Sequence, residues 1–195
     1  MEPEYTYYEA RKLDSLFTYN DYIEIDDNNR YEVIDGELYM MSSPSSIHQM
    51  VVMEVVGQLY NALNGKPCRP FVSPMDVRLF YEEDGSDDTI VQPDVFVVCD
   101  KNKIGKNSIN GAPDFVVEVL SPSNSLFEMS LKQSKYEVSG VREYWMIDLE
   151  NKELLGYVLT NGVFKGERDV LGGIKNIDVL GINIDLDRVN NVIGI

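Results

Sequence analysis

The run from Phe115 to Leu120, with the sequence FVVEVL, constrains the fold more than any other part of the chain. Apolar residues surround a single carboxylate, Glu118, which is the composition of a strand buried on both faces of a sheet. A carboxylate in such surroundings costs several kcal/mol unless a cation, hydrogen bonds or a proton compensates for its burial. We therefore expect a metal ion or a lysine beside Glu118.

Asp94 has similar surroundings. It follows Gln92 and Pro93 and leads into the apolar run Val95 to Val98, which predicts a second carboxylate at the start of, or within, a buried strand. If the two strands are neighbours, Asp94 and Glu118 can converge on one hard divalent cation, which takes oxygen ligands. Each carboxylate taken alone could instead be a cap or a strand-edge charge that reaches solvent. Their joint occurrence favours the shared site.

A helix is predicted after the FVVEVL strand, from about Ser123 to Ser139-Gly140. The order strand, turn, helix brings the helix back across the sheet, so Lys132 or Lys135 can face the same cleft. Glu128 lies one turn before Lys132, and such a pair is also typical of an exposed helix face, where it contributes only ~0.2–0.5 kcal/mol. The pattern alone does not choose between the two lysines.

A β-hairpin is predicted nearer the N-terminus. Asp35-Gly36 separates Tyr31 to Ile34 from Glu37 to Met41, and a two-residue hairpin turn needs positive φ at both central residues. Residues 1–30 are acidic and rich in tyrosine, and we interpret them as a lid or arm with a short helix capped by Thr18.

The remaining elements complete a mixed α/β architecture within one domain, residues 1–195. Apolar residues at helical spacing predict a helix between Ser43 to Ser46 and Asn64-Gly65, packed on a sheet. Gly and Asn turns beyond Asn161 indicate a small β-rich C-terminal part. Further strands are predicted at Met75 to Phe80, Val91 to Val98, Tyr144 to Asp148 and Leu154 to Leu159.

Net charge restricts the partners of this chain. Lys and Arg number 17 against 33 Asp and Glu, a formal net charge of -16, whereas binding to nucleic acids depends largely on neutralising phosphates. Any nucleic-acid role must therefore be local. The densest basic stretch, Lys101, Lys103 and Lys106, lies in a polar stretch and has the composition of a solvated loop.

Targeting signals and cysteines indicate the compartment. No apolar stretch approaches the ~20 residues that span a bilayer, and residues 1–4 lack the basic and apolar start of a signal peptide. We predict a cytoplasmic protein with no membrane partner. The only cysteines are Cys68 and Cys99, and Cys99 ends an apolar run, which is the ordinary setting of a buried reduced thiol. We expect neither a disulfide framework nor a zinc site.

Five motifs recur along the chain in a characteristic order and spacing. They are YEVIDGEL at 31–38, the helix opening near His48, Gln92-Pro93-Asp94, APDFVVEVLSPS at 112–123 and GVREYWMID at 140–148. Together they resemble the Uma2 family of bacterial restriction endonucleases, from about Phe17 to the C-terminus. The resemblance implies the restriction endonuclease-like fold of the PD-(D/E)XK nucleases and metal-dependent hydrolysis of DNA.

The resemblance also implies roles for particular residues. Asp94, Glu118 and the backbone carbonyl of Val119 would hold Mg²⁺ or Mn²⁺. Lys132 would orient or deprotonate the attacking water and stabilise the charge that grows at phosphorus. In the common form of this site the lysine lies two residues after the glutamate, where this chain has Leu120. The family pattern places it in the following helix, where Lys132 matches.

Lys135 does not match that pattern. One departure from the family lies just before Lys132, where members usually carry basic residues and an aspartate and this chain has NSLFE at 124–128. The change removes basic residues that could contact phosphate. Glu128 could replace the acidic position, but we do not assign it as a metal ligand.

Three residues are accessory candidates. Glu37 follows the hairpin turn and could point into the cleft, as the resemblance suggests, or face solvent as an ordinary strand residue. His48, the only histidine, is on the apolar stripe of its helix, where a core or capping role competes with a catalytic one. Gln92 lies next to the Pro93-Asp94 pair.

Two other classes of function fit the sequence. A module that kept the nuclease fold could bind a protein or its own copy, which the acidic composition favours. A phosphohydrolase acting on a small molecule would suffer less from the net negative charge, because fewer phosphates must approach. A homodimer is also conceivable, since nucleases of this fold often pair to cut both strands.

Overall fold

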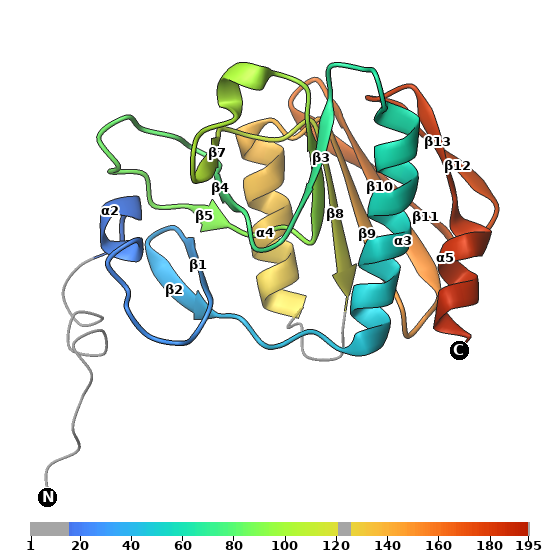
Figure 1. Cartoon of the computed structure of the whole chain (residues 1–195), viewed down its shortest axis with the longest axis horizontal. Helices are drawn as coiled ribbons and strands as arrows, with labels where there is room; N and C mark the ends of the chain where they lie inside the picture. Colours follow the sequence, from blue (N-terminus) through green and yellow to red (C-terminus); the bar gives the residue numbers. More distant parts are fainter. Residues whose placement is uncertain (1–15, 121–125, 195) are drawn as a thin grey trace, which may run out of the picture.

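The computed structural model describes residues 16–120 and 126–194, and the strands among them form three sheets (Figure 1). The largest sheet has the order β11-β10-β9-β8-β6-β3 and consists of Val163–Val170, Glu153–Thr160, Glu143–Asp148, Phe115–Leu120, Val95–Val98 and Arg69–Val72. The second has the order β2-β1-β5-β4-β7 and consists of Glu37–Met40, Tyr31–Ile34, Ile90–Val91, Asp76–Arg78 and Ser108–Asn110. The third pairs β12 (Ile174–Ile177) with β13 (Ile182–Asp185).

Helices cover both faces of the largest sheet. The helices of the described residues are α2 (Tyr19–Tyr22), α3 (Ser46–Leu63), α4 (Leu126–Ser139), α5 (Leu186–Ile193) and a 3₁₀ helix at Lys101–Lys103. In Figure 1, α3 and α4 lie on opposite sides of this sheet, and α5 lies beside α3. β8 runs parallel to β9 and antiparallel to β6. The predicted mixed α/β class is confirmed.

The centre of the largest sheet is buried on both faces, as the FVVEVL run predicts. Val95, Val117 and the other odd-numbered residues of β6 and β8 pack in the apolar cluster that contains α3 and α5. Phe96 and Val116 pack in the cluster that contains α4 and the second sheet. Because side chains alternate along a strand, Glu118 faces the α4 side.

The predicted helix α3 forms as the apolar spacing indicates. Ser45 caps it, since its hydroxyl accepts a hydrogen bond from the backbone N–H of His48 at 3.2 Å. The helix ends at Leu63, shortly before Gly65 with its positive φ of 77°. One stripe, which begins with His48 and ends with Leu63, is buried against the sheet.

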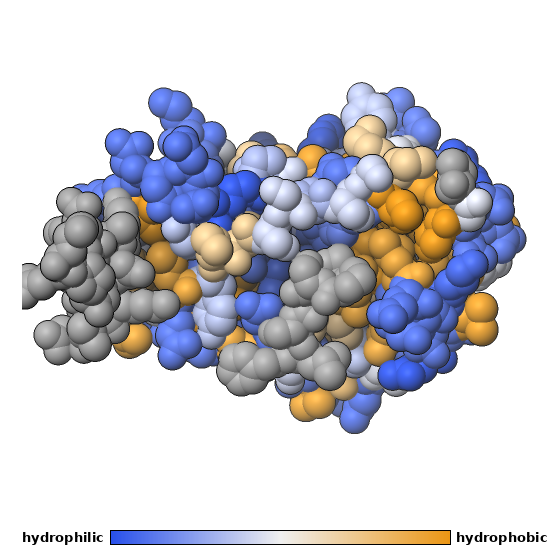
Figure 2. All heavy atoms as spheres, turned by 90° about the horizontal axis from the view of Figure 1, so that it is seen from below, coloured by the Kyte–Doolittle hydropathy of each residue, from blue (hydrophilic) through white to orange (hydrophobic). Residues whose placement is uncertain are grey.

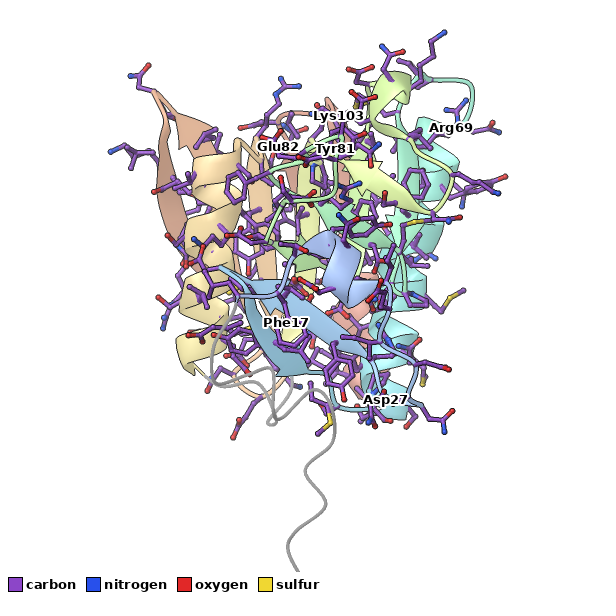
Figure 3. The ribbon with its side chains drawn as sticks, turned by 90° about the vertical axis from the view of Figure 1, so that its left-hand side faces the viewer. Phe17, Asp27, Arg69, Tyr81, Glu82 and Lys103 are labelled. Atoms are coloured by element: carbon purple, nitrogen blue, oxygen red, sulfur yellow. A yellow bond between two sulfur atoms is a disulfide. The ribbon has the colours of Figure 1, made fainter. Side chains whose placement is uncertain are left out.

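The predicted hairpin also forms, with positive φ at both Asp35 and Gly36. Residues 16–30 pack on it rather than extending away as a free arm. The Phe17 N–H donates to the carbonyl of Gly36 at 2.9 Å, and the Phe17 ring is buried with Val33 and Ile90 (Figure 3). Thr18 caps α2, as predicted. Residues 1–15, the rest of the predicted arm, lie outside the described residues.

The single strand predicted from Val91 to Val98 is wrong. The chain leaves the second sheet after β5 and enters the largest sheet at β6, and the segment Gln92-Pro93-Asp94 joins the two. Proline has no N–H for a ladder hydrogen bond, so a strand ends readily there. This break places Asp94 at the junction of the two sheets.

Several elements were not predicted. The strand β3 contains Pro70, which disfavours a strand except at a sheet edge, and β3 is indeed an edge strand. The strand β7 is short and follows the basic stretch, in which Lys103 donates to the carbonyl of Ala112 at 2.7 Å. The C-terminal part contains the helix α5 as well as strands, and Asp185 caps this helix. The predicted start of α4 at Ser123 lies outside the described residues.

The expectation of reduced cysteines is contradicted, because Cys68 and Cys99 form a disulfide. Antiparallel pairing of β3 with β6 puts Arg69 opposite Val98, so the cysteines that flank this pair also lie opposite each other. The sequence did not suggest the bond because β3, which brings Cys68 to Cys99, was not predicted.

One face of the molecule shows how polar and apolar side chains are distributed on the surface. Viewed from below, much of it is hydrophilic, and hydrophobic side chains gather on the side where α3 and α5 lie (Figure 2). Within the described ranges, every helix is too short or too polar to cross a bilayer.

Phe115→Ala tests the packing of the largest sheet. Phe115 is fully buried and its ring lies edge-on to Trp145, with 5.2 Å between the ring centroids. We expect the substitution to lower the free energy of unfolding by about 3–5 kcal/mol, because it leaves a cavity. Val163→Ala on the exposed edge of β11 should cost less than about 0.5 kcal/mol in the same urea titration. Equal losses in both variants would contradict the assignment of this core.

Candidate active site

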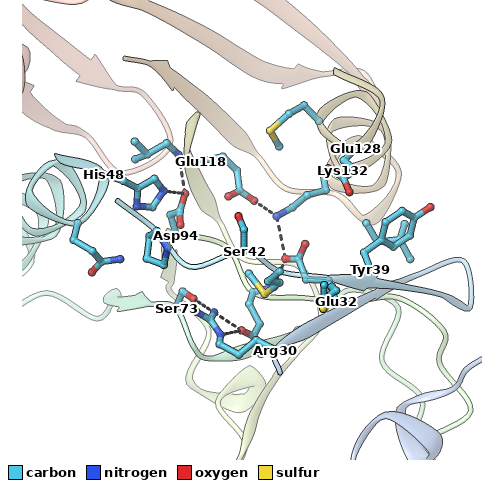
Figure 4. A pocket seen from close by; sticks show the side chains of 18 residues that line it. Arg30, Glu32, Tyr39, Ser42, His48, Ser73, Asp94, Glu118, Glu128 and Lys132 are labelled. Atoms are coloured by element: carbon cyan, nitrogen blue, oxygen red, sulfur yellow. Dashed lines mark hydrogen bonds and ion pairs between the residues drawn. The ribbon is translucent and has the colours of Figure 1, made fainter. Parts of the chain in front are cut away.

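A pocket lies where the two larger sheets separate, with a cavity volume of about 190 Å³ (Figure 4). It is lined by side chains from the hairpin, α3, the β5–β6 junction, the end of β8, and α4. Among them are the three residues predicted to carry the chemistry, Asp94, Glu118 and Lys132. The structure therefore brings together residues that are far apart in the sequence.

Lys132 lies between two buried carboxylates. Its Nζ is 2.6 Å from Glu118 Oε1 and 3.0 Å from Glu32 Oε1 (Figure 4). The hydroxyl of Tyr136, one turn further along α4, donates to the same Glu118 oxygen at 2.7 Å. The sequence predicts a compensating group next to Glu118, and these two side chains of α4 are what the structure places there.

Burial and charge shift the pKa values of this cluster. The pKa of Glu118 is raised to about 7, because burial raises it by more than the nearby ammonium of Lys132 lowers it, and the charge of Asp94 adds to the rise. Burial lowers the pKa of Lys132, but the charges of Glu118 and Glu32 raise it more, so its pKa lies above the ordinary value. The pKa of Tyr136 is raised, first by burial and then by the charge of Glu118.

Asp94 is oriented by two donors. Its Oδ2 lies 3.1 Å from His48 Nε2 and accepts a hydrogen bond from the Val119 N–H at 2.8 Å. Burial lowers the pKa of His48, but the hydrogen bond and charge of Asp94 raise it more, so its pKa lies above the ordinary value. His48 is thus a buried partner of Asp94, and its Nδ1 makes no hydrogen bond to any described residue.

The donor set fits a hard divalent cation. Within the described ranges, Asp94 Oδ1 and Glu118 Oε2 accept no hydrogen bond, which leaves one carboxylate oxygen on each residue available as a ligand. The described residues contain no group of three His, Cys, Asp or Glu side chains that could hold an ion by themselves. A cation here would therefore take two carboxylates and fill its other positions with backbone oxygen, water or substrate.

Glu32 was not predicted as a site residue. It lies in β1, is buried, and accepts hydrogen bonds from Lys132 and from the Gln92 N–H at 2.7 Å. Its sequence signal is a carboxylate between Tyr31 and Val33 in a predicted strand, the same kind of signal that identifies Glu118.

Gln92, an accessory candidate, lies in the pocket wall and connects it to α2. Its Nε2 donates to Asp76 Oδ1 at 2.8 Å and to the hydroxyl of Tyr22 at 3.0 Å. Its Oε1 accepts from Arg30. Burial raises the pKa of Asp76 and of Tyr22, with Asp76 adding to the rise at Tyr22.

Two other candidates lie apart from this cluster. Glu37 is exposed, accepts a hydrogen bond from the Tyr39 hydroxyl at 3.0 Å and is not part of the pocket wall. Lys135 points to the hairpin turn, where its Nζ is 2.5 Å from Asp35 Oδ1. The structure thus distinguishes Lys132 from Lys135, while Glu128 lines the pocket with Lys132.

Lys132→Met tests the buried cluster. The change leaves Glu32 and Glu118 buried without their shared cation, and we expect the free energy of unfolding to fall by about 3–5 kcal/mol. Lys135→Met is a matched control on the same helix. Its pair with the more exposed Asp35 should contribute at most about 1 kcal/mol. Urea titrations in EDTA at neutral pH measure both, and a larger loss for Lys135→Met would contradict the argument.

Comparisons with known proteins agree with this architecture. A family model described as "Uma2: Putative restriction endonuclease" matches residues 18–182. A crystal structure described as a putative nuclease belonging to DUF820, from Anabaena variabilis, has a TM-score of 0.74 at 16% identity. The match covers 91% of this chain and 99% of that one. The restriction endonuclease-like fold predicted from the sequence is thereby confirmed.

A curated relative was also found. "Uncharacterized protein slr1290" from Synechocystis sp. is 26% identical over 118 residues. The alignment covers 60% of this chain and 60% of that protein, so the chain matches about three fifths of the relative's length.

Proposed function

The chain belongs to the Uma2 family, and we propose from this premise that it is a metal-dependent endonuclease that hydrolyses phosphodiester bonds in DNA. One observation carries the proposal: Asp94, Glu118 and Lys132 line the same pocket, with Lys132 Nζ 2.6 Å from Glu118. Two carboxylates can hold a divalent cation, and an ammonium can stabilise the negative charge that grows on a phosphate.

Asp94 and Glu118, with the backbone carbonyl of Val119, would hold Mg²⁺ or Mn²⁺. When bound, such an ion polarises a phosphoryl oxygen and lowers the pKa of a water ligand. His48 and the Val119 N–H each bond Asp94 Oδ2, and these bonds orient the carboxylate so that its second oxygen remains available. Tyr136 does the same for Glu118.

Lys132 would act on the substrate directly. An ammonium has three N–H donors, and Glu32 and Glu118 account for two of them. The third can bond the attacking water or a phosphate oxygen. In either position the positive charge stabilises the negative charge that grows on the phosphate in the transition state. Glu32 is a positioning residue, because it acts by holding Lys132.

The net charge of -16 favours a second candidate, hydrolysis of a small phosphate ester such as a nucleotide. A small substrate brings fewer negative charges to an acidic surface than a DNA duplex does. Product analysis after incubation with plasmid DNA, RNA and nucleoside triphosphates distinguishes the two candidates. A protein that processes none of these in Mg²⁺ or Mn²⁺ would contradict both candidates and favour a binding module.

Asp94→Asn tests the catalytic assignment. The amide keeps the size of the side chain but removes the charge, so we expect the rate of Mn²⁺-dependent plasmid nicking to fall by at least about 100-fold. Circular dichroism should show an unchanged fold. Asp84→Asn, the same change in an exposed loop outside the pocket, should leave the rate unchanged. Full nicking activity in Asp94→Asn would remove the proposed role.

Metal binding has a readout that does not depend on activity. Because a ligand that binds only the folded state stabilises it, Mn²⁺ at about 100 times its dissociation constant should add about 2.7 kcal/mol to the free energy of unfolding. We expect this gain in the wild type and in Asp84→Asn, and its loss in Asp94→Asn and Glu118→Gln. Denaturation with and without Mn²⁺ measures it. Equal gains in all four proteins would place the ion elsewhere.

A further inference from the structure

Arg30 is a cation in the pocket wall that the proposed mechanism does not use. It precedes β1, and its half-buried side chain reaches the pocket. Its Nη2 donates to Ser73 Oγ and to Gln92 Oε1, both at 2.5 Å, and its Nε lies 3.2 Å from the same Gln92 oxygen. Both acceptors are neutral.

The positive charge of Arg30 has no partner of opposite sign at contact distance. Among the described residues, no carboxylate oxygen lies within 4.0 Å of its guanidinium nitrogens, and its Nη1 donates no hydrogen bond. Arg78 and Arg142, by comparison, each pair with an aspartate. With 33 acidic side chains available in the sequence, an arginine that keeps neutral partners inside a pocket remains able to bind an anion.

The guanidinium is also held in one orientation. Gln92, its main acceptor, is fixed at its amide nitrogen by Asp76 and Tyr22 and at its backbone N–H by Glu32. A planar guanidinium that is already oriented loses little entropy when it binds, and its fork of donors matches the oxygens of a phosphate.

Arg30 and Lys132 are the two Lys or Arg side chains in the described lining of this pocket. Figure 4 shows them reaching the pocket from different sides, Lys132 from α4 and Arg30 from the position that precedes β1. A phosphate group that reaches both would meet a positive charge on each side. Four carboxylates, Glu32, Asp94, Glu118 and Glu128, line the same pocket, and Glu32 and Glu118 are paired with Lys132.

We propose that Arg30 is a phosphate-binding residue of this site and that its Nη1 donates to a non-bridging oxygen of the phosphodiester. The inference rests on the proposed function for the identity of the substrate. It adds that this contact recognises the charge and geometry of a phosphate and carries no sequence information of its own.

Binding of a fluorescein-labelled short DNA duplex, measured by anisotropy with Ca²⁺ as the only divalent cation, tests the proposal without requiring cleavage. We expect Arg30→Gln to raise the dissociation constant by at least about 10-fold, the effect of losing a hydrogen bond between charged groups. The slope of log K against log salt should become shallower by about 0.9, the contribution of one phosphate contact. A purely structural role of Arg30 would not change that slope.

Two variants control this measurement. Arg168→Gln makes the same change of charge on the exposed edge strand β11 and should leave binding within about twofold of the wild type, because a distant surface charge is screened. Arg30→Lys keeps the charge but not the fork, and should bind with an intermediate dissociation constant. If Arg30→Gln does not fold, the dissociation constant of Arg30→Lys is compared with that of the wild type instead.

The outcomes separate this inference from the proposed function. If the wild type binds duplex and does not cleave it, and Arg30→Gln weakens binding with the expected change of slope, the inference holds and the endonuclease assignment fails. If the wild type cleaves DNA and Arg30→Gln binds as tightly as Arg168→Gln, the assignment holds and the inference is wrong. Wild-type protein that binds neither the duplex nor dimethyl phosphate also overturns the inference.

Discussion

The buried cluster of Glu32, Lys132 and Glu118 is the interaction on which the arrangement of this molecule depends. Each of the three charges comes from a different part of the fold: the second sheet, α4 and the largest sheet. Removing a charge from water costs several kcal/mol, and only a complete set of partners offsets that cost. Tyr136 and the Gln92 N–H complete the set. Loss of any one partner would leave a buried charge uncompensated, so these contacts favour this packing of the three elements.

The junction Gln92-Pro93-Asp94 connects this cluster to the side of the pocket where the Asp94 carboxylate lies. Its first residue belongs to the hydrogen-bond network of the second sheet, through Glu32 and Asp76. Its last residue belongs to the end of the largest sheet, where Val119 fixes its carboxylate. Because only Pro93 separates them, a displacement of one sheet relative to the other would change the position of Asp94. The pocket thus lies where the two sheets separate, and the short segment Gln92-Pro93-Asp94 joins the sheets at that point.

Much of the fold could be predicted where the signals are local. The run around Glu118, the Asp35-Gly36 turn and the stripe of α3 each specify a structure through a few neighbouring residues. The elements that were missed, β3, β7 and α5, are short, and β3 contains a proline, so pairing or packing with distant parts of the chain determines them. The disulfide was missed for the same reason, because Cys68 meets Cys99 only once β3 has paired with β6.

The residues of the site also divide into those with a local sequence signal and those placed by distant parts of the chain. Burial within an apolar run identified Asp94 and Glu118, whereas spacing left Lys132 and Lys135 equivalent until the family resemblance separated them. Arg30 gave no local signal, and Glu32 gave only that of a carboxylate in a short predicted strand. The place of both residues in the pocket depends on the pairing of β1 with β5 and on Gln92, about sixty residues further along. The total charge of -16 describes the whole chain and not the pocket. Interactions between charges further apart than about 8–10 Å are largely screened at physiological ionic strength. A phosphate in the pocket would therefore respond mainly to the charges that line it, which are Lys132 and Arg30 on one hand and Glu32, Asp94, Glu118 and Glu128 on the other.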